Sequence, residues 1–187
     1  TYTTAPSSTA FPFTDVAESR WSYPYIKELY DAGVVSGTSA TTFSPAANVT
    51  RAQFVTMLAG LAGADVSNCP ATPFRDVPEG AWYAPYVNWA LANGIVSGTS
   101  AVTFSPDASI TRQDMAVMLY SYTQRFQVHL QQQPVTPFTD ADSIAAYAQI
   151  AVQTLQRAGV ISGMPDGSFQ PYGTATREQA CTMLCML

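Results

Sequence analysis

The stretch GIVSGTSAVTFSPDASITRQDM at residues 94–115 occurs in three variants along the chain, and this repetition decides the fold. The first variant is GVVSGTSATTFSPAANVTRAQF at residues 33–54, and the third is GVISGMPDGSFQPYGTATREQA at residues 159–180. The variants lie 61 and then 65 residues apart, a spacing that indicates a repeat architecture. We therefore expect three copies of one structural unit.

The similarity extends upstream, into a segment that we expect to form the first helix of each unit. Every copy opens with a phenylalanine, an aspartate two residues later, and then an aromatic residue. In the second copy, Trp82, Tyr86 and Trp89 follow helical spacing, and Gly94 supplies a stop signal at the helix end. The opening residues are Phe13, Phe74 and Phe138, with Asp15, Asp76 and Asp140 and then Trp21, Trp82 and Tyr147.

A second helix is expected to begin at the Thr-Arg pair in each copy. The threonine is a good N-cap because its hydroxyl accepts a hydrogen bond from a free backbone N–H in the first turn. Gln53 and Gln179 stand three residues after the threonine and match a reciprocal capping box, whereas Asp114 is a shorter variant. Residues 34–49 form a long loop between the two helices, which we expect to be ordered and held by Phe43.

These elements predict an all-α fold of three tandem helix-loop-helix repeats. The repeats span residues 13–66, 74–128 and 138–187, after a linker tail at residues 1–12 that is rich in Thr, Ser, Ala and Pro. A two-helix unit of this size buries too little apolar surface alone, so the copies should share one core in a single composite domain. The tail indicates a segment of a longer protein.

The composition argues against several classes of partner. Hydrophobic residues make up 47% of the 187 residues, whereas 8 Lys and Arg against 13 Asp and Glu give a net charge of −5. Nucleic acids and anionic membranes need a basic face, and no apolar run reaches the roughly 18 residues of a membrane-spanning helix. We expect no nucleic acid, no membrane insertion, and only local binding of any anion.

Metal and cofactor sites are not expected. Cys181 and Cys185 lie four residues apart, which suits two ligands on one helix face, but Cys69 is distant and the one histidine is His129. We interpret the cysteines as structural thiols and His129 as an exposed linker residue.

The combination Phe-x-Asp-Val, Trp, Gly-Val/Ile-Val/Ile-Ser-Gly, Phe-x-Pro and Thr-Arg resembles the S-layer homology (SLH) repeat, over residues 13–187 and in the family's usual three copies. The resemblance implies a pseudo-threefold trimer with a central three-helix bundle. It also implies an extracellular module of a bacterial cell wall or S-layer that binds secondary cell-wall polysaccharide in grooves between repeats. The implied glycan ends in a pyruvate ketal on N-acetylmannosamine, and a peptidoglycan-linked glycan is a further candidate.

The sequence departs from the family pattern at two points. The usual Thr-Arg-Ala-Glu keeps its threonine and arginine in all three copies but never its glutamate. The third copy also has Tyr147 in place of tryptophan and Ala141 in place of valine. We therefore expect one groove to bind weakly or not at all.

Arginines at the starts of the second helices are the main candidates for ligand contact. Such an arginine combines a planar guanidinium with free backbone N–H groups and the positive end of the helix dipole, which suits a carboxylate or phosphate. The alternative is an internal pair with the aspartate that opens each repeat, and both hold if the aspartate orients the arginine. These candidates are Arg51, Arg112 and Arg177, with Asp15, Asp76 and Asp140.

Two further sets of residues are candidates for the same site. The aromatic residues Trp21, Trp82 and Tyr147 either stack on a sugar face or belong to the core. The glycines of the Ser-Gly turns complete the set, and the serines before them are not nucleophiles because no histidine accompanies them. These glycines are Gly37, Gly98 and Gly163.

Two classes of function are compared: a carbohydrate-binding anchor, and a glycan-active enzyme or protein-protein assembly module that uses the same repeat. Glycoside hydrolysis needs an acid and a base across one bond, so a catalytic pair occurs once, whereas these aspartates recur in every repeat. We expect a non-covalent cell-wall anchor without catalytic residues.

Overall fold

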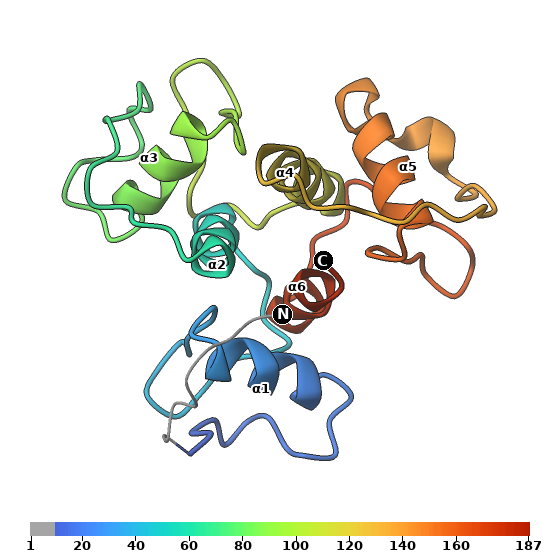
Figure 1. Cartoon of the computed structure of the whole chain (residues 1–187), viewed down its shortest axis with the longest axis horizontal. Helices are drawn as coiled ribbons and strands as arrows, with labels where there is room; N and C mark the ends of the chain where they lie inside the picture. Colours follow the sequence, from blue (N-terminus) through green and yellow to red (C-terminus); the bar gives the residue numbers. More distant parts are fainter. Residues whose placement is uncertain (1–9) are drawn as a thin grey trace.

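The computed structural model describes residues 10–187, and all regular elements within them are helical (Figure 1). Each repeat contributes two α-helices, which confirms the predicted all-α, helix-loop-helix architecture. The helices are α1 (Tyr23–Asp31), α2 (Arg51–Ala62), α3 (Ala84–Ala92), α4 (Arg112–Arg125), α5 (Gln149–Arg157) and α6 (Arg177–Cys185), with short 3-10 turns at η1 (Ala141–Ser143) and η2 (Ala146–Ala148).

The helix ends follow the signals in the sequence. The helices α2, α4 and α6 each begin directly after a threonine whose side chain accepts the backbone N–H of the third helical residue. Gln53 and Gln179 complete the predicted capping boxes, and Asp114 does not. The first helices end just before glycines in the left-handed conformation, which glycine adopts without steric cost. These are Gly33, Gly94 and Gly159, with φ of 73°, 69° and 73°.

The second helices lie at the centre of the molecule and the first helices lie outside them. Figure 1 shows α2, α4 and α6 nearly end-on around the middle, with α1, α3 and α5 in three surrounding lobes. Each outer helix packs against the inner helix of the preceding repeat in a cyclic order: α3 on α2, α5 on α4, and α1 on α6. Every repeat therefore depends on both of its neighbours.

Backbone hydrogen bonds close the same ring at the helix starts. The N–H groups of Arg51 and Ala52 donate to the carbonyls of Ala108 and Pro106 in the next repeat, at 2.9 and 3.0 Å. Because these bonds repeat at every boundary, the backbone itself joins the three units. The equivalent pairs are Arg112 to Gly173, Gln113 to Pro171, Arg177 to Ala47, and Glu178 to Pro45.

The described end of the predicted linker tail packs against the first repeat. The Phe11 ring meets the rings of Phe13, Tyr23 and Tyr30 edge to face, with centroids 5.2, 5.2 and 5.8 Å away. This part of the tail therefore belongs to the first lobe. The prediction for residues 1–9 lies outside the described residues.

We expect that no single repeat folds alone. In a fragment of residues 13–66, α1 and α2 lack α6 and α3, the helices against which they pack. Isolated helices of 9 and 12 residues are marginal in water. The fragment should show no cooperative thermal transition by circular dichroism, whereas the whole chain should unfold cooperatively. A sharp transition in the isolated fragment would contradict a shared core.

Candidate ligand-binding site

Each arginine at a helix start reaches across to the next repeat in the ring. Arg177, 4% exposed, donates from Nε to the Phe43 carbonyl at 2.8 Å and from Nη2 to the Ser36 carbonyl at 2.9 Å. Its guanidinium lies 4.5 Å from the centroid of the Phe43 ring, a cation–π contact. The arginines therefore join the repeats. The same contacts link Arg51 with Phe104 and Ser97, and Arg112 with Phe169 and Ser162.

The opening aspartates hold the same phenylalanine segments from within their own repeat. The Asp15 carboxylate accepts the backbone N–H groups of Phe43 and Ser44, at 2.9 and 2.8 Å. Ser44 has a φ of 56°, uncommon for a residue other than glycine, and these bonds stabilise it. Within residues 10–187, no ion pair joins these aspartates to the arginines, so that alternative is wrong. Asp76 and Asp140 bond residues 104–105 and 169–170 in the same way.

The prediction that free N–H groups at the helix starts hold an anion is wrong. In α6, the N–H groups of Arg177 and Glu178 donate to backbone carbonyls of the first repeat, and that of Gln179 donates to its own N-cap hydroxyl. The backbone N–H groups at the starts of α2 and α4 are hydrogen-bonded in the same way. Because these N–H groups already bond the neighbouring repeat, an anion beside the helix start has the arginine guanidinium as its main hydrogen-bond donor.

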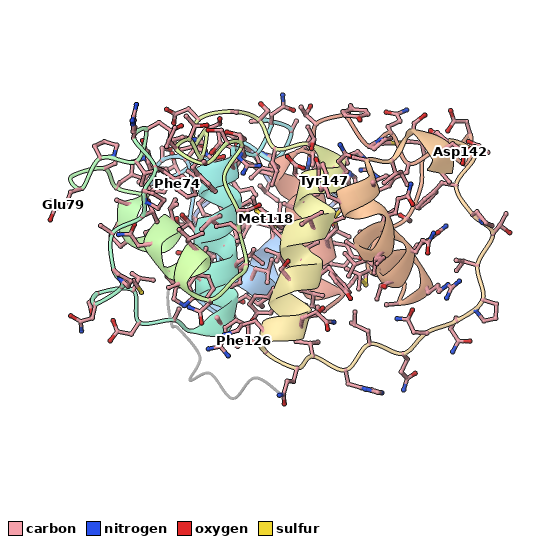
Figure 2. All side chains as sticks on the ribbon, turned by 90° about the horizontal axis from the view of Figure 1, so that it is seen from above. Phe74, Glu79, Met118, Phe126, Asp142 and Tyr147 are labelled. Carbon is pink, nitrogen blue, oxygen red and sulfur yellow. The ribbon has the colours of Figure 1, made fainter. Side chains whose placement is uncertain are left out.

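Two equivalent pockets lie beside two of the arginines. The Arg177 pocket has a volume of about 370 Å³, and its lining includes Arg177, residues 34–38, Gln53, Met57 and Trp82. The Arg51 pocket has a volume of about 330 Å³, and its lining includes Arg51, residues 95–99, Asp114, Met118 and Tyr147. Figure 2 shows Tyr147 and Met118 near each other at α4.

Each pocket takes residues from all three repeats. The Arg177 pocket combines an arginine of the third repeat, a loop and helix of the first repeat, and Trp82 of the second. Residues of the third repeat are consequently divided between the two pockets. Tyr147 belongs to the Arg51 pocket, whereas Arg177 belongs to the other.

The two arginines differ in their remaining donors. Nη1 of Arg51 forms an ion pair with the Asp114 carboxylate at 3.2 Å. Nη1 of Arg177 has no hydrogen-bond partner among residues 10–187, and it is not sealed from solvent. Burial lowers the pKa of both arginines, yet a guanidinium stays charged in proteins. The Arg177 pocket therefore presents an unpaired positive charge.

The aromatic residues of the repeat lie on the surface. Trp21, Trp82 and Tyr147 are 55%, 58% and 64% exposed, so the alternative that places them in the core is wrong. Burial and a hydrogen bond to Asp114 raise the pKa of Tyr147 to about 12, which keeps its hydroxyl protonated as a donor. An exposed ring beside a polar pocket suits stacking against a sugar.

The glycines of the Ser-Gly turns are required for steric reasons. A Cβ atom on Gly37 would lie 2.4 Å from the Ser39 carbonyl oxygen and 2.5 Å from that of Thr42. On Gly98 and Gly163 it would meet backbone oxygens at 2.2 and 2.8 Å. The turn that lines each pocket can therefore form only with glycine at this position.

Two interactions near the arginines were not predicted from the sequence. The first is the ion pair of Asp114, for which the signal was a charged residue where the other copies have glutamine. The second is Glu178, 7% exposed, which accepts from Arg20 at 2.8 Å and from the Ser22 hydroxyl at 2.7 Å. The first repeat has Ala52 at the position equivalent to Glu178, so the repeat pattern carries no signal for this contact.

Metal chemistry has no support in the described residues. No group of three or more His, Cys, Asp or Glu side chains in residues 10–187 could hold a metal ion. Burial raises the pKa of Cys181 and Cys185 to about 12, so both remain protonated thiols. None of the described helices is long and apolar enough to span a bilayer.

Comparison with known proteins shows the same repeat. A family model described as the S-layer homology domain matches residues 12–55, 73–116 and 137–181. The chain is 40% identical to an endoglucanase of Bacillus sp. (strain KSM-635), over 99% of the chain and 19% of that protein. It is 28% identical to a cellulosome-anchoring protein of Acetivibrio thermocellus, over 82% of the chain and 35% of that protein. It is 26% identical to an S-layer protein of Bacillus thuringiensis subsp. finitimus, over 92% of the chain and 21% of that protein.

Proposed function

The chain belongs to the S-layer homology domain family, which is located at the bacterial cell surface, and we propose that it is an anchoring module. In this proposal it attaches a larger protein non-covalently to an acidic wall polysaccharide. The proposed ligand is secondary cell-wall polysaccharide with a terminal pyruvate ketal. The proposed location of binding is the set of grooves between the repeats. The chain spans about a fifth to a third of the relatives described above, which agrees with a module attached to other domains.

The unpaired guanidinium of Arg177 carries this proposal. Arg177 lines a pocket that also holds an exposed aromatic ring, Trp82, and this combination suits a sugar bearing a carboxylate. With a net charge of −5, the chain has no general attraction for an anionic polymer, so a local donor must supply it. Each charge-assisted hydrogen bond of this kind contributes about 1.5 to 3 kcal/mol.

We do not propose an enzymatic function for this chain. Each opening aspartate already accepts two backbone N–H groups, and this arrangement is suited to holding a loop rather than to proton transfer. The endoglucanase relative does not argue otherwise, because the chain corresponds to only 19% of its length.

Binding to purified wall polymer tests the proposal. The chain should bind polymer that carries its acidic substituent and lose most of that binding, about tenfold or more, when the ketal is removed, because the guanidinium loses its partner. The measurement is calorimetry with intact and ketal-free polymer, with an assay of new reducing ends on the same samples. Equal binding to both polymers would contradict the proposed ligand, and release of reducing ends would contradict a non-catalytic role.

A further inference from the structure

The two pockets share the Ser-Gly-Thr turn, and two of the positions at which they differ touch each other. Ser-Gly-Thr lines both pockets, at residues 36–38 and 97–99. Where the Arg177 pocket has Gln53 and Trp82, the Arg51 pocket has Asp114 and Tyr147. The Tyr147 hydroxyl donates to Asp114 Oδ1 at 2.6 Å, and Arg51 Nη1 donates to Asp114 Oδ2 at 3.2 Å. These two differing positions therefore form one interacting unit in the Arg51 pocket.

The length of the side chain explains why Asp114 faces its pocket. Gln53 turns back to the helix start, where its Oε1 accepts the N–H of the N-cap Thr50 at 3.0 Å. Aspartate is one methylene shorter, and Asp114 makes no such bond to the N-cap of α4. Its carboxylate is consequently left to pair with Arg51 and Tyr147 at the pocket.

The Asp114 carboxylate accepts a hydrogen bond from Nη1 of Arg51. The equivalent atom of the other pocket, Nη1 of Arg177, is unpaired. An incoming carboxylate at Arg51 Nη1 would compete for that donor and would lie at contact distance from a negative charge. The arginine and the facing third-position residue carry a formal charge of zero in the Arg51 pocket and of +1 in the Arg177 pocket. The Ser-Gly-Thr turn is shared, whereas the formal charge at the third helical position differs between the two pockets.

We propose that Asp114 is a specificity-determining residue that closes the Arg51 pocket to carboxylate ligands, so that of these two pockets only the Arg177 pocket takes the acidic sugar. This inference rests on the proposed function. It adds that the pockets are not interchangeable, and that a single residue at the third helical position decides which of them recognises the anion.

Amide chemical shifts in NMR spectra can follow each pocket separately. The probe is the methyl glycoside of N-acetylmannosamine carrying a pyruvate ketal. In the parent chain, the probe should shift the amides of Gly37 and Thr38, with at least tenfold weaker response at Gly98 and Thr99. Asp114→Gln, which restores the residue of the other two copies, should bring Gly98 and Thr99 into the response at the lower concentration. The reciprocal Gln53→Asp should weaken the response of Gly37 and Thr38 at least tenfold.

The outcomes separate this inference from the proposed function. Equal responses of both pockets in the parent chain would overturn the inference and leave the proposed function intact. The inference would also be overturned if, in Asp114→Gln, the probe shifts the amides of Gly37 and Thr38 but not those of Gly98 and Thr99. If neither pocket responds in any of the three proteins, the proposed ligand is wrong, and the inference falls with it.

Discussion

Arg177→Ala should weaken binding of the ketal-bearing polymer about tenfold or more, because it removes the unpaired guanidinium of the Arg177 pocket. The variant should also lose stability, since the Phe43 and Ser36 carbonyls lose their donor and the Phe43 ring loses its cation–π contact. Binding is therefore measured by calorimetry at a temperature where circular dichroism shows the variant to be folded. Arg177→Lys should restore binding only in part, because lysine keeps the charge and loses the planar fork.

Arg51→Ala is the matched control for this experiment. Arg51 makes the equivalent buried contacts with Phe104 and Ser97 and also pairs with Asp114, so Arg51→Ala should lose at least as much stability as Arg177→Ala. Asp114 already pairs with Arg51, however, so removal of Arg51 should change ketal binding far less. Removing the ketal and Arg177 together should cost little more than either change alone, since both delete one interaction. If Arg177→Ala binds intact polymer as tightly as the parent chain does, the arginines serve only to join the repeats, and an equal loss in both variants would contradict the difference between the pockets.

Much of the fold could be predicted because repetition and capping are local signals. The Thr-Arg pairs fixed the starts of three helices, and glycines at 33, 94 and 159 marked the ends of the other three. The cyclic packing could not be predicted in the same way. Nothing in the spacing of α1 and α2 says that each packs against a helix of another repeat, because that choice depends on three-dimensional closure.

The sequence predicted several of the residues that line the site, but not the partners to which their polar groups are hydrogen-bonded. Arg177 and Trp82 do meet at one pocket, although they belong to different repeats and lie far apart in the sequence. The helix N–H groups were expected to face a ligand, yet the ring closes through them. The aspartates that recur with the arginines hold backbone instead. A residue type shared by all copies thus indicates what holds the repeats together, whereas the differences at Asp114 and Tyr147 indicate how the pockets diverge.

Gly98→Ala should destabilise the domain by about 3 kcal/mol or more. The new Cβ would lie 2.2 Å from the Ser100 carbonyl oxygen, 2.4 Å from that of Thr103 and 2.6 Å from the Phe74 ring. Two of these atoms belong to the backbone of the same turn, so a side chain cannot simply rotate away. The turn would have to open, and Ser97, whose carbonyl accepts a hydrogen bond from Arg51, would move with it. The midpoint and slope of urea unfolding measure the loss.

Gly80→Ala is the control that separates this steric effect from the general cost of replacing glycine. A Cβ on Gly80 meets nothing within 4 Å, and its φ is not in the left-handed region, so the substitution should change the free energy of unfolding by about 0.5 kcal/mol or less. Gly98 and Gly80 lie in the same repeat, which keeps the background constant. Equal unfolding midpoints for the two variants would show that the turn tolerates a side chain. In that case, the glycine of the Ser-Gly turn would have to be explained by contact with the ligand instead of by the fold.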